Sequence, residues 1–215
     1  MNPKISTHLI FALVLVSIPL SANDPFEAFN RKIWAFNEFL DDNLAKPTAE
    51  IYRSIAPDPV EVAVSNFFRN MNELDNTANQ VLQGHPILAI NDFSRFIINS
   101  TIGLAGFLDV ASRLGLERHD EDFGQTLGSW GVSSGPYLMI PIYGPSTPRS
   151  LTGRSVSSVL SGTFAIKEND VRFAITGLDA LETRARYLQV ESLIIGDRYS
   201  FIRDSYMQYQ EFESS

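Results

Sequence analysis

Two short motifs contain residue types that could carry out catalysis or bind a metal ion. Residues 131–135 match the G-x-S-x-G pattern of serine hydrolases, in which Ser133 would be the nucleophile. That pattern needs a preceding strand, and it needs an acid and a histidine further along the chain to activate the serine hydroxyl. No histidine follows His119, and no strand pattern precedes Gly131. We therefore expect no nucleophilic catalysis at Ser133.

The second motif, residues 117–122, combines His119 with several carboxylates that could bind a divalent cation. Its spacing fits neither an EF-hand loop nor an HExxH helix, so we expect a solvated turn. The chain has no cysteine, which excludes thiolate zinc sites, a cysteine nucleophile and disulfide bonds. We expect no catalytic residue, no metal site and no cofactor.

The balance of charge argues against nucleic acid as a partner. The 215 residues contain 17 basic and 25 acidic side chains, which gives a net charge of −8. No run of Lys or Arg is present that could neutralise a phosphate backbone. With 44% hydrophobic residues, the chain is long enough for one domain with a core.

The first 22 residues have the organisation of a secretory signal peptide. Lys4 supplies a positive charge, residues 9–18 form a short apolar segment, and Ser21 and Ala22 are the small residues before the expected cleavage site. The apolar segment is too short to cross about 30 Å of hydrocarbon. We expect a cleavable signal peptide over residues 1–22, an envelope location, and a single mature domain over residues 23–213.

Helix signals dominate the mature chain. A first amphipathic helix is expected over residues 24–43, with Asp24 as its N-cap. Its apolar side chains recur at steps of three and four along one stripe: Phe26, Phe29, Ile33, Phe36 and Leu40. No strand-like alternation competes with these helix signals.

Further helix starts are expected at Lys46, Asp58, Pro86, Asn169 and Asp197. The helix that starts at Asp58 is followed by a polar stretch, residues 72–83, which stops at Gly84. Glu182 and Arg186 lie four residues apart and are expected to form a surface ion pair. The last two helices are expected to face water.

The middle of the mature chain carries no charge. Residues 123–148 contain five glycines and four prolines, which exclude an ordinary transmembrane helix. Spacings of four, three and four would place the glycines on one helical face, where a second backbone could approach closely: Gly124, Gly128, Gly131 and Gly135. Two interpretations stand here, a close-packed or membrane-depth structure and a buried glycine-rich loop.

Several motifs resemble, in order along the chain, the MlaA/VacJ family of outer-membrane phospholipid-trafficking proteins. They are DPFEAFNRKIWAFN at residues 24–37, Asn66-Phe67, LQGHP at 82–86, FSRFIINSTIGLAGFLDVA at 93–111, FGQTLGSWGVSSGPYLMIPIYGPSTPR at 123–149, LDALETRARYL at 178–188 and DRYSFIRDSYMQYQEF at 197–212. The resemblance covers nearly the whole mature chain, and the glycine-rich and proline-rich motif is its most specific part.

The resemblance implies an all-α fold, a ring of amphipathic helices embedded in the outer membrane around an amphipathic channel, with C-terminal helices on the periplasmic side. It also implies a non-enzymatic function. Mislocalised phospholipid would be removed from the outer leaflet and passed to a soluble periplasmic carrier, and a trimeric porin would be a second protein partner. This transport would maintain the lipid asymmetry of the membrane.

The resemblance also assigns candidate site residues. Those of the lipid channel would be Gly124, Gly128, Trp130, Gly131, Gly135, Pro136, Tyr137, Pro141 and Tyr143. Those of the membrane rim would be Asn66, Phe67 and Phe68, together with Phe26, Phe29, Ile33 and Phe36.

The chain departs from the family pattern at its expected N-terminus. Family members are typically lipoproteins with a cysteine after a Leu-Ser-Ala/Gly-like motif, but here Asn23 follows Leu20-Ser21-Ala22. No thioether can form, so we expect ordinary signal-peptidase cleavage, with aromatic helix faces in place of an acyl anchor. Ser150 and Arg198 also replace residue types that are common in the family. Two alternative functions remain, a soluble periplasmic carrier of a hydrophobic ligand and a porin-associated structural adaptor.

Overall fold

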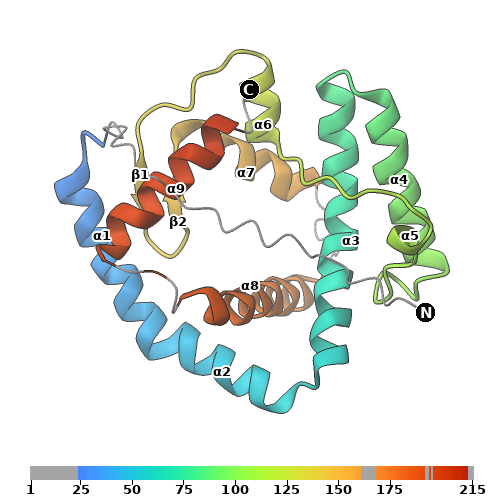
Figure 1. The fold of residues 1–215 in the computed structure, drawn as a ribbon, viewed down its shortest axis with the longest axis horizontal. Coiled ribbons are helices and arrows are strands. Elements are labelled where there is room, and N and C mark those ends of the chain that lie inside the picture. The colour runs from blue at the N-terminus through green and yellow to red at the C-terminus, as the bar shows by residue number, and fades with distance from the viewer. Residues whose placement is uncertain (1–23, 161–167, 192–193, 195, 213–215) are drawn as a thin grey trace, which may run out of the picture.

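The computed structural model describes residues 24–160, 168–191, 194 and 196–212. The expected signal peptide lies outside these residues. Figure 1 shows the described helices following one another around a ring, from blue at the N-terminal end to red at the C-terminal end. The all-α fold is confirmed, since helices make up nearly all the regular structure of the described residues and a short hairpin is the exception.

One side of the ring is a single continuous helical path. α1 (Glu27–Leu40) passes through a π-helical turn, η1 (Asp41–Ala45), into α2 (Lys46–Ile55). The predicted start of α1 at Asp24 is wrong by three residues, because Asp24 accepts the Phe26 N–H at 3.2 Å in a turn that precedes the helix. The predicted break before Lys46 is also absent. Pro47 has no N–H to donate, and the wider π turn just before it lets the helical path continue.

The opposite side is built from two long helices. α3 (Asp58–Leu82) packs along α4 (Pro86–Thr101), and the short α5 (Val110–Arg113) packs against α4. The polar stretch after residue 71 is helical as far as Leu82 and is largely buried, Glu73 and Asn79 almost completely. Gly84 then ends the helix region with φ of +81°, a conformation that glycine adopts without strain.

The uncharged middle segment is folded in two different ways. Its first part is α6 (Phe123–Ser129), and its second is an antiparallel hairpin of β1 (Leu138–Ile140) and β2 (Gly144–Ser146). The prediction that four glycines share one helical face is wrong, because Gly131 and Gly135 lie beyond α6 with φ of +86° and +78°. The sequence pattern does not predict the two strands of this hairpin. Figure 1 shows the hairpin inside the ring, next to α1.

The prediction of close backbone packing does hold at Gly124. α7 (Pro148–Leu160) packs on α6 so closely that a Cβ on Gly153 would lie 2.3 Å from the Gly124 nitrogen. Only glycine at position 153 allows this approach.

Two helices complete the ring. α8 (Asn169–Glu191) packs mainly against α2, and α9 (Arg198–Phe212) lies beside β2. The predicted Glu182–Arg186 pair forms at 3.0 Å, with Arg186 48% exposed as expected for a surface pair but the Glu182 side chain only 4% exposed. A small core of Tyr137, Met139 and Tyr199 joins the hairpin to α9, and Ile33 and Trp34 of α1 pack against it.

Candidate functional site

The burial pattern of this protein is unusual, because many of its most buried side chains are polar. Arg95, Gln80 and Glu73 are each at most 2% exposed, whereas charged side chains in water-soluble proteins are rarely buried so completely. Large apolar side chains lie outside instead, with Phe29 at 60% and Ile87 at 80% exposure. The ring therefore has an outer surface that is apolar and an interior that is rich in hydrogen-bonding groups.

The apolar surface extends over α1 and α4. On α1 it includes the predicted rim residues Phe26, Phe29 and Phe36, all of which are exposed. Ile33 differs, because it packs against the core. On α4 and the segment that follows, the exposed apolar side chains are Ile87, Ile90, Phe93, Ile97, Ile102, Leu104, Phe107 and Leu108. A surface of this kind typically contacts a partner or a membrane.

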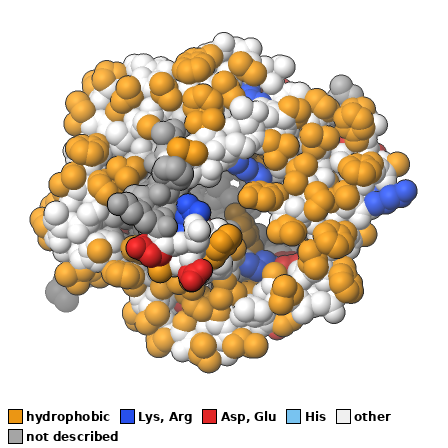
Figure 2. Space-filling model, turned by 180° about the vertical axis from the view of Figure 1, so that it is seen from behind, with side chains coloured by type: hydrophobic (Ala, Val, Ile, Leu, Met, Phe, Trp, Pro, Cys, Tyr) orange, Lys and Arg blue, Asp and Glu red, His pale blue; other side chains and the backbone are white. Residues whose placement is uncertain are grey.

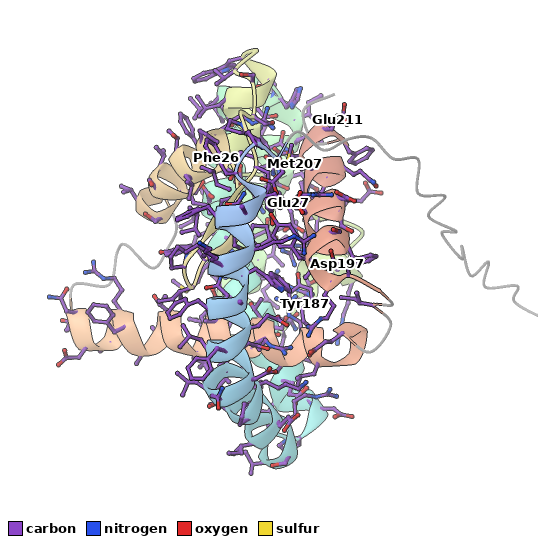
Figure 3. The ribbon with its side chains drawn as sticks, turned by 90° about the vertical axis from the view of Figure 1, so that its left-hand side faces the viewer. Phe26, Glu27, Tyr187, Asp197, Met207 and Glu211 are labelled. Atoms are coloured by element: carbon purple, nitrogen blue, oxygen red, sulfur yellow. The ribbon has the colours of Figure 1, made fainter. Side chains whose placement is uncertain are left out.

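Figure 2 shows one face of the molecule, where orange hydrophobic side chains surround a central hollow. Charged side chains of both signs lie at the edge of this hollow. In Figure 3, Glu27 points from α1 towards α9, where Asp197 lies just before the helix and Met207 lies on it, while Phe26, just before α1, lies on the other side. At the start of α1, a charged and an aromatic side chain thus lie on opposite sides.

A buried polar network joins α3, α4 and α5. Arg95 Nε donates to Glu73 Oε1 at 2.7 Å, and its guanidinium also contacts Asp109 at 3.3 Å. Asn99 donates to the same Asp109 carboxylate at 3.1 Å. Burial raises the pKa of Glu73, while hydrogen bonds from Arg95 and Asn76 act to lower it. These contacts satisfy charges between α3, α4 and α5 that would otherwise be very costly to bury.

The acidic loop at residues 117–122 belongs to this network. His119 Nδ1 lies 2.7 Å from Asp92 Oδ1, and Glu121 accepts Gln83 Nε2 at 2.8 Å. Arg118 forms an ion pair with Asp120. In the part of the chain that the structure describes, His, Asp and Glu side chains form no group able to hold a metal ion. The predicted solvated turn is thus partly buried, with its polar groups bound to α3 and α4.

Two asparagines of α1 bind the hairpin. Asn30 and Asn37 lie seven residues apart, which is two helical turns, and so they face the same side. Asn30 bonds Met139 N and Tyr137 O, and Asn37 bonds Ile142 N and Ile140 O. The outer edge of β1 is thereby paired with side-chain amides instead of a third strand.

The predicted channel residues do not form one wall. Tyr137 is fully buried in the core, and Gly124 is buried against α7. Gly128 lies in α6, while Gly131, Gly135 and the half-buried Pro136 lie in the loop that follows it. Trp130 is 54% exposed, and its Nε1 donates to the Leu82 carbonyl at 3.2 Å.

The remaining channel candidates lie together at the tip of the hairpin. Pro141 and Tyr143 are both exposed there, Tyr143 to 70%. Ile142 between them has φ of +69°, a strained conformation for a β-branched residue. The Asn37 carboxamide, which accepts the Ile142 N–H at 2.8 Å, supports this turn.

The other rim candidates are tied to the segment after α4. Phe67 stacks on Phe107 with 5.3 Å between ring centroids, and Asn66 donates to the Phe107 carbonyl at 3.2 Å. Phe68 is different, because it is only 6% exposed and packs inward. This joint holds the exposed residues Leu104 and Leu108 against α3.

Sequence reasoning missed a pocket of about 210 Å³ between α2, α3 and α8. Its wall contains Tyr52, Glu61, Arg69, Glu182 and Arg186, from three helices that are far apart in the chain. Each of these residues looks like an ordinary polar helix residue in the sequence, so no local signal could have identified the pocket.

None of the described helices combines the length and the apolar character that crossing a membrane requires. The features above define a class of helical protein with a ring-like arrangement, buried polar side chains and an apolar outer surface. The chain belongs to the MlaA lipoprotein family, whose profile it matches over residues 22–213. The resemblance seen in the motifs is thus confirmed.

Relatives from several bacteria agree with this assignment. The chain is 34% identical over 204 residues to the intermembrane phospholipid transport system lipoprotein MlaA of Haemophilus influenzae, covering 89% of this chain and 79% of that protein. It is 34% identical over 196 residues to the protein of the same name from Escherichia coli, covering 88% of this chain and 78% of that one. A solved structure described as the structural basis for maintenance of bacterial outer membrane lipid asymmetry matches with a TM-score of 0.80 and 32% identity, covering 89% of this chain and 99% of that chain.

Proposed function

We propose that this protein is a non-enzymatic phospholipid transporter of the outer membrane. It would remove mislocalised phospholipid from the outer leaflet and pass it to a soluble periplasmic carrier. The observation that carries this proposal is the reversed burial pattern, with Arg95 and Glu73 buried between the helices and Phe29 and Ile87 exposed on the surface. The names of the relatives support the same activity.

The two surfaces of the ring match the two parts of a phospholipid. The apolar exterior would lie among acyl chains, which cannot hydrogen-bond and therefore exclude polar side chains. The charged side chains at the edge of the central hollow would accompany a charged head group that has to pass the hydrocarbon region (Figure 2). A lipid moving through such a ring changes its surroundings without any bond being broken, so transport needs no catalytic residue.

Aromatic side chains of α1 would attach the protein to the membrane. Phe26, Phe29, Phe36 and Phe39 are between 46% and 63% exposed. Full burial of such a side chain contributes ~1.5–3 kcal/mol, so moving these half-exposed groups into acyl chains contributes on the order of 3–6 kcal/mol in total. Since Asn23 stands where the family has its lipidated cysteine, this attachment would replace an acyl anchor. A trimeric porin would contact the remaining apolar surface around α4.

Deletion of the gene tests the transport function. Phospholipid in the outer leaflet should rise on deletion and return to normal with the wild-type gene. An unchanged outer leaflet would contradict the proposal. If the leaflet changes but the protein is recovered wholly in the soluble periplasm after a carbonate wash, a soluble carrier replaces the membrane-embedded transporter as the explanation.

A pair of variants on α1 tests the membrane attachment. Phe29→Ser should increase the fraction released by carbonate, because it removes an exposed aromatic side chain. Lys32→Gln, on the same helix and also exposed, is the matched control and should leave release unchanged. Equal release of both variants would contradict attachment through the aromatic face.

A further inference from the structure

The pocket between α2, α3 and α8 has its charges separated into two ends. Burial and the carboxylates of Glu61 and Glu182 raise the pKa of Tyr52, which places this tyrosine at the acidic end. Burial and the guanidinium groups of Arg118 and Arg186 lower the pKa of Arg69, while the Glu182 carboxylate acts to raise it. Arg69 therefore marks the basic end, and Glu182, which is paired with Arg186 and acts on both Tyr52 and Arg69, lies between the two ends. An acidic and a basic end in one pocket of about 210 Å³ suit a ligand that carries both charges.

The spacing along α3 separates these two ends. Glu61, Ser65 and Arg69 follow one another at steps of four and therefore line one face of the helix. Glu61 and Arg69 are eight residues apart, or about 12 Å along the helix axis, and their long side chains can converge from the two ends. Val62 and Ala185 add apolar wall beside the charged groups.

Several polar groups in and beside this pocket have no partner. The Tyr52 hydroxyl is buried without a hydrogen bond, and so is the Nε of the neighbouring Arg118. Arg69 is an exposed residue that forms no hydrogen bond or ion pair within the described residues, whereas Arg186 is paired with Glu182 at 3.0 Å. Buried polar groups are nearly always satisfied in native proteins, so the unpaired Tyr52 hydroxyl in the wall of this pocket indicates a ligand. The pocket of about 210 Å³ has room for a ligand, since one water molecule occupies only about 10–15 Å³ by the same measure.

We propose that this pocket binds the zwitterionic phosphoethanolamine head group of a phospholipid. The phosphate lies between Arg69 and Arg186, where it relieves the repulsion between the two cations, and the ammonium lies near Glu61 and the Tyr52 hydroxyl. Two arginines and two glutamates line the pocket, so a neutral zwitterion fits its charge better than an anionic head group does. This inference rests on the proposed function and names the lipid class on which that function acts.

The test measures binding of soluble short-chain lipids to the full mature chain in detergent by titration calorimetry. Dihexanoyl phosphatidylethanolamine should bind at least tenfold more tightly than dihexanoyl phosphatidylglycerol, which lacks the ammonium. Free phosphoethanolamine, which has no glycerol or acyl chain, should bind far more weakly than the lipid. Equal affinity for free phosphoethanolamine would overturn the lipid assignment and identify a site for a small phosphate ester.

Three variants then locate the binding. Glu61→Gln should weaken the binding of phosphatidylethanolamine about tenfold and leave the binding of phosphatidylglycerol unchanged. Arg69→Gln should weaken the binding of both lipids, because both contain the phosphate. Arg113→Gln, on α5 and outside the pocket, is the matched control. Circular dichroism and the unfolding temperature check that each variant is folded.

The outcomes separate this inference from the proposed function. If folded Glu61→Gln keeps the full preference for phosphatidylethanolamine, or if Arg113→Gln weakens binding as much as Arg69→Gln, the pocket is not the head-group site. Transport would still stand in that case, provided that gene deletion alters the outer leaflet. An unaltered leaflet would instead overturn the proposed function, whatever the binding preference of the pocket.

Discussion

The carboxamide of Asn30 on α1 pairs with the backbone of Met139 on β1, where Asn30 Oδ1 accepts the Met139 N–H at 2.9 Å. Its Nδ2 donates to the Tyr137 carbonyl at 3.2 Å, and the side chain is fully buried. One amide thus satisfies two backbone groups at a strand edge that would otherwise lie unpaired inside the ring. The hairpin is thereby fixed to α1 across more than a hundred residues of sequence.

Replacement of the Asn30 carboxamide should destabilise the protein. Asn30→Ala is expected to lower the free energy of unfolding by about 2–4 kcal/mol, because it leaves buried backbone groups without partners. Asn43→Ala is the control, since Asn43 is exposed and its amide bonds only the Phe39 carbonyl one turn away. Denaturant titration in detergent measures the free energy of unfolding of both variants. A loss of stability in Asn43→Ala as large as in Asn30→Ala would show that the hairpin contact is not the cause.

The buried pair of Glu73 and Arg95 allows a double-mutant cycle. Each side chain is at most 2% exposed, so Arg95→Met should lower the free energy of unfolding by about 3–5 kcal/mol by leaving Glu73 charged and unpaired. The double variant Arg95→Met/Glu73→Gln should cost clearly less than the sum of the single variants, because the buried Glu73 charge, which Arg95→Met leaves without its partner, is then absent as well, and the lost Asp109 contact is common to both Arg95 variants. Additive costs would contradict direct coupling between the two groups.

Asp75 should make stability depend on pH. Burial raises its pKa to about 6. The unfolded carboxyl titrates near its ordinary value of about 3.9, so between roughly pH 4 and pH 6 the folded state holds the extra proton. Stability should therefore fall as the pH rises through this window, by on the order of 2–3 kcal/mol.

Comparison of the wild type with Asp75→Asn isolates this contribution. The amide keeps the shape of the carboxyl but does not titrate, so the fall in unfolding free energy between roughly pH 4 and pH 6 should become smaller. Unfolding curves measured at several pH values in this range give the result. An identical pH profile in both proteins would mean that Asp75 is not responsible.

The close approach of α6 and α7 predicts opposite effects of two glycine substitutions. Gly153→Ala should destabilise the protein, because its Cβ would lie 2.3 Å from the Gly124 nitrogen. Gly177→Ala should be neutral or stabilise by up to about 1 kcal/mol, since Gly177 lies in α8 with nothing within 4 Å of its Cβ position. Unfolding temperatures of the two variants check this. If Gly153→Ala is as stable as Gly177→Ala, the described helix contact is not tight in solution.

Most helices could be predicted from the sequence, whereas the hairpin could not. The starts of α3 at Asp58 and of α4 at Pro86 could be predicted, because a proline in the first turn of each helix lacks an N–H that would have no partner there anyway. The residues of β1 give no strand pattern, and the partners that complete its edge, Asn30 and Asn37, lie more than a hundred residues away. Tyr137 illustrates the same limit, since its motif indicated a channel residue and its position is the core.

The sequence by itself determined the family, the helical character and the aromatic stripe of α1, all of which depend on residue type and local spacing. Only the tertiary structure decided which side chains face inward. The polar residues Glu73, Asn79 and Arg95 look solvated in the sequence, and they are buried because partners from other elements satisfy their charges and hydrogen bonds. The pocket that separates Glu61 from Arg69 likewise exists only where α2, α3 and α8 meet. Local propensity acts over a few residues, but burial of a polar group requires a partner, and folding alone brings distant partners together.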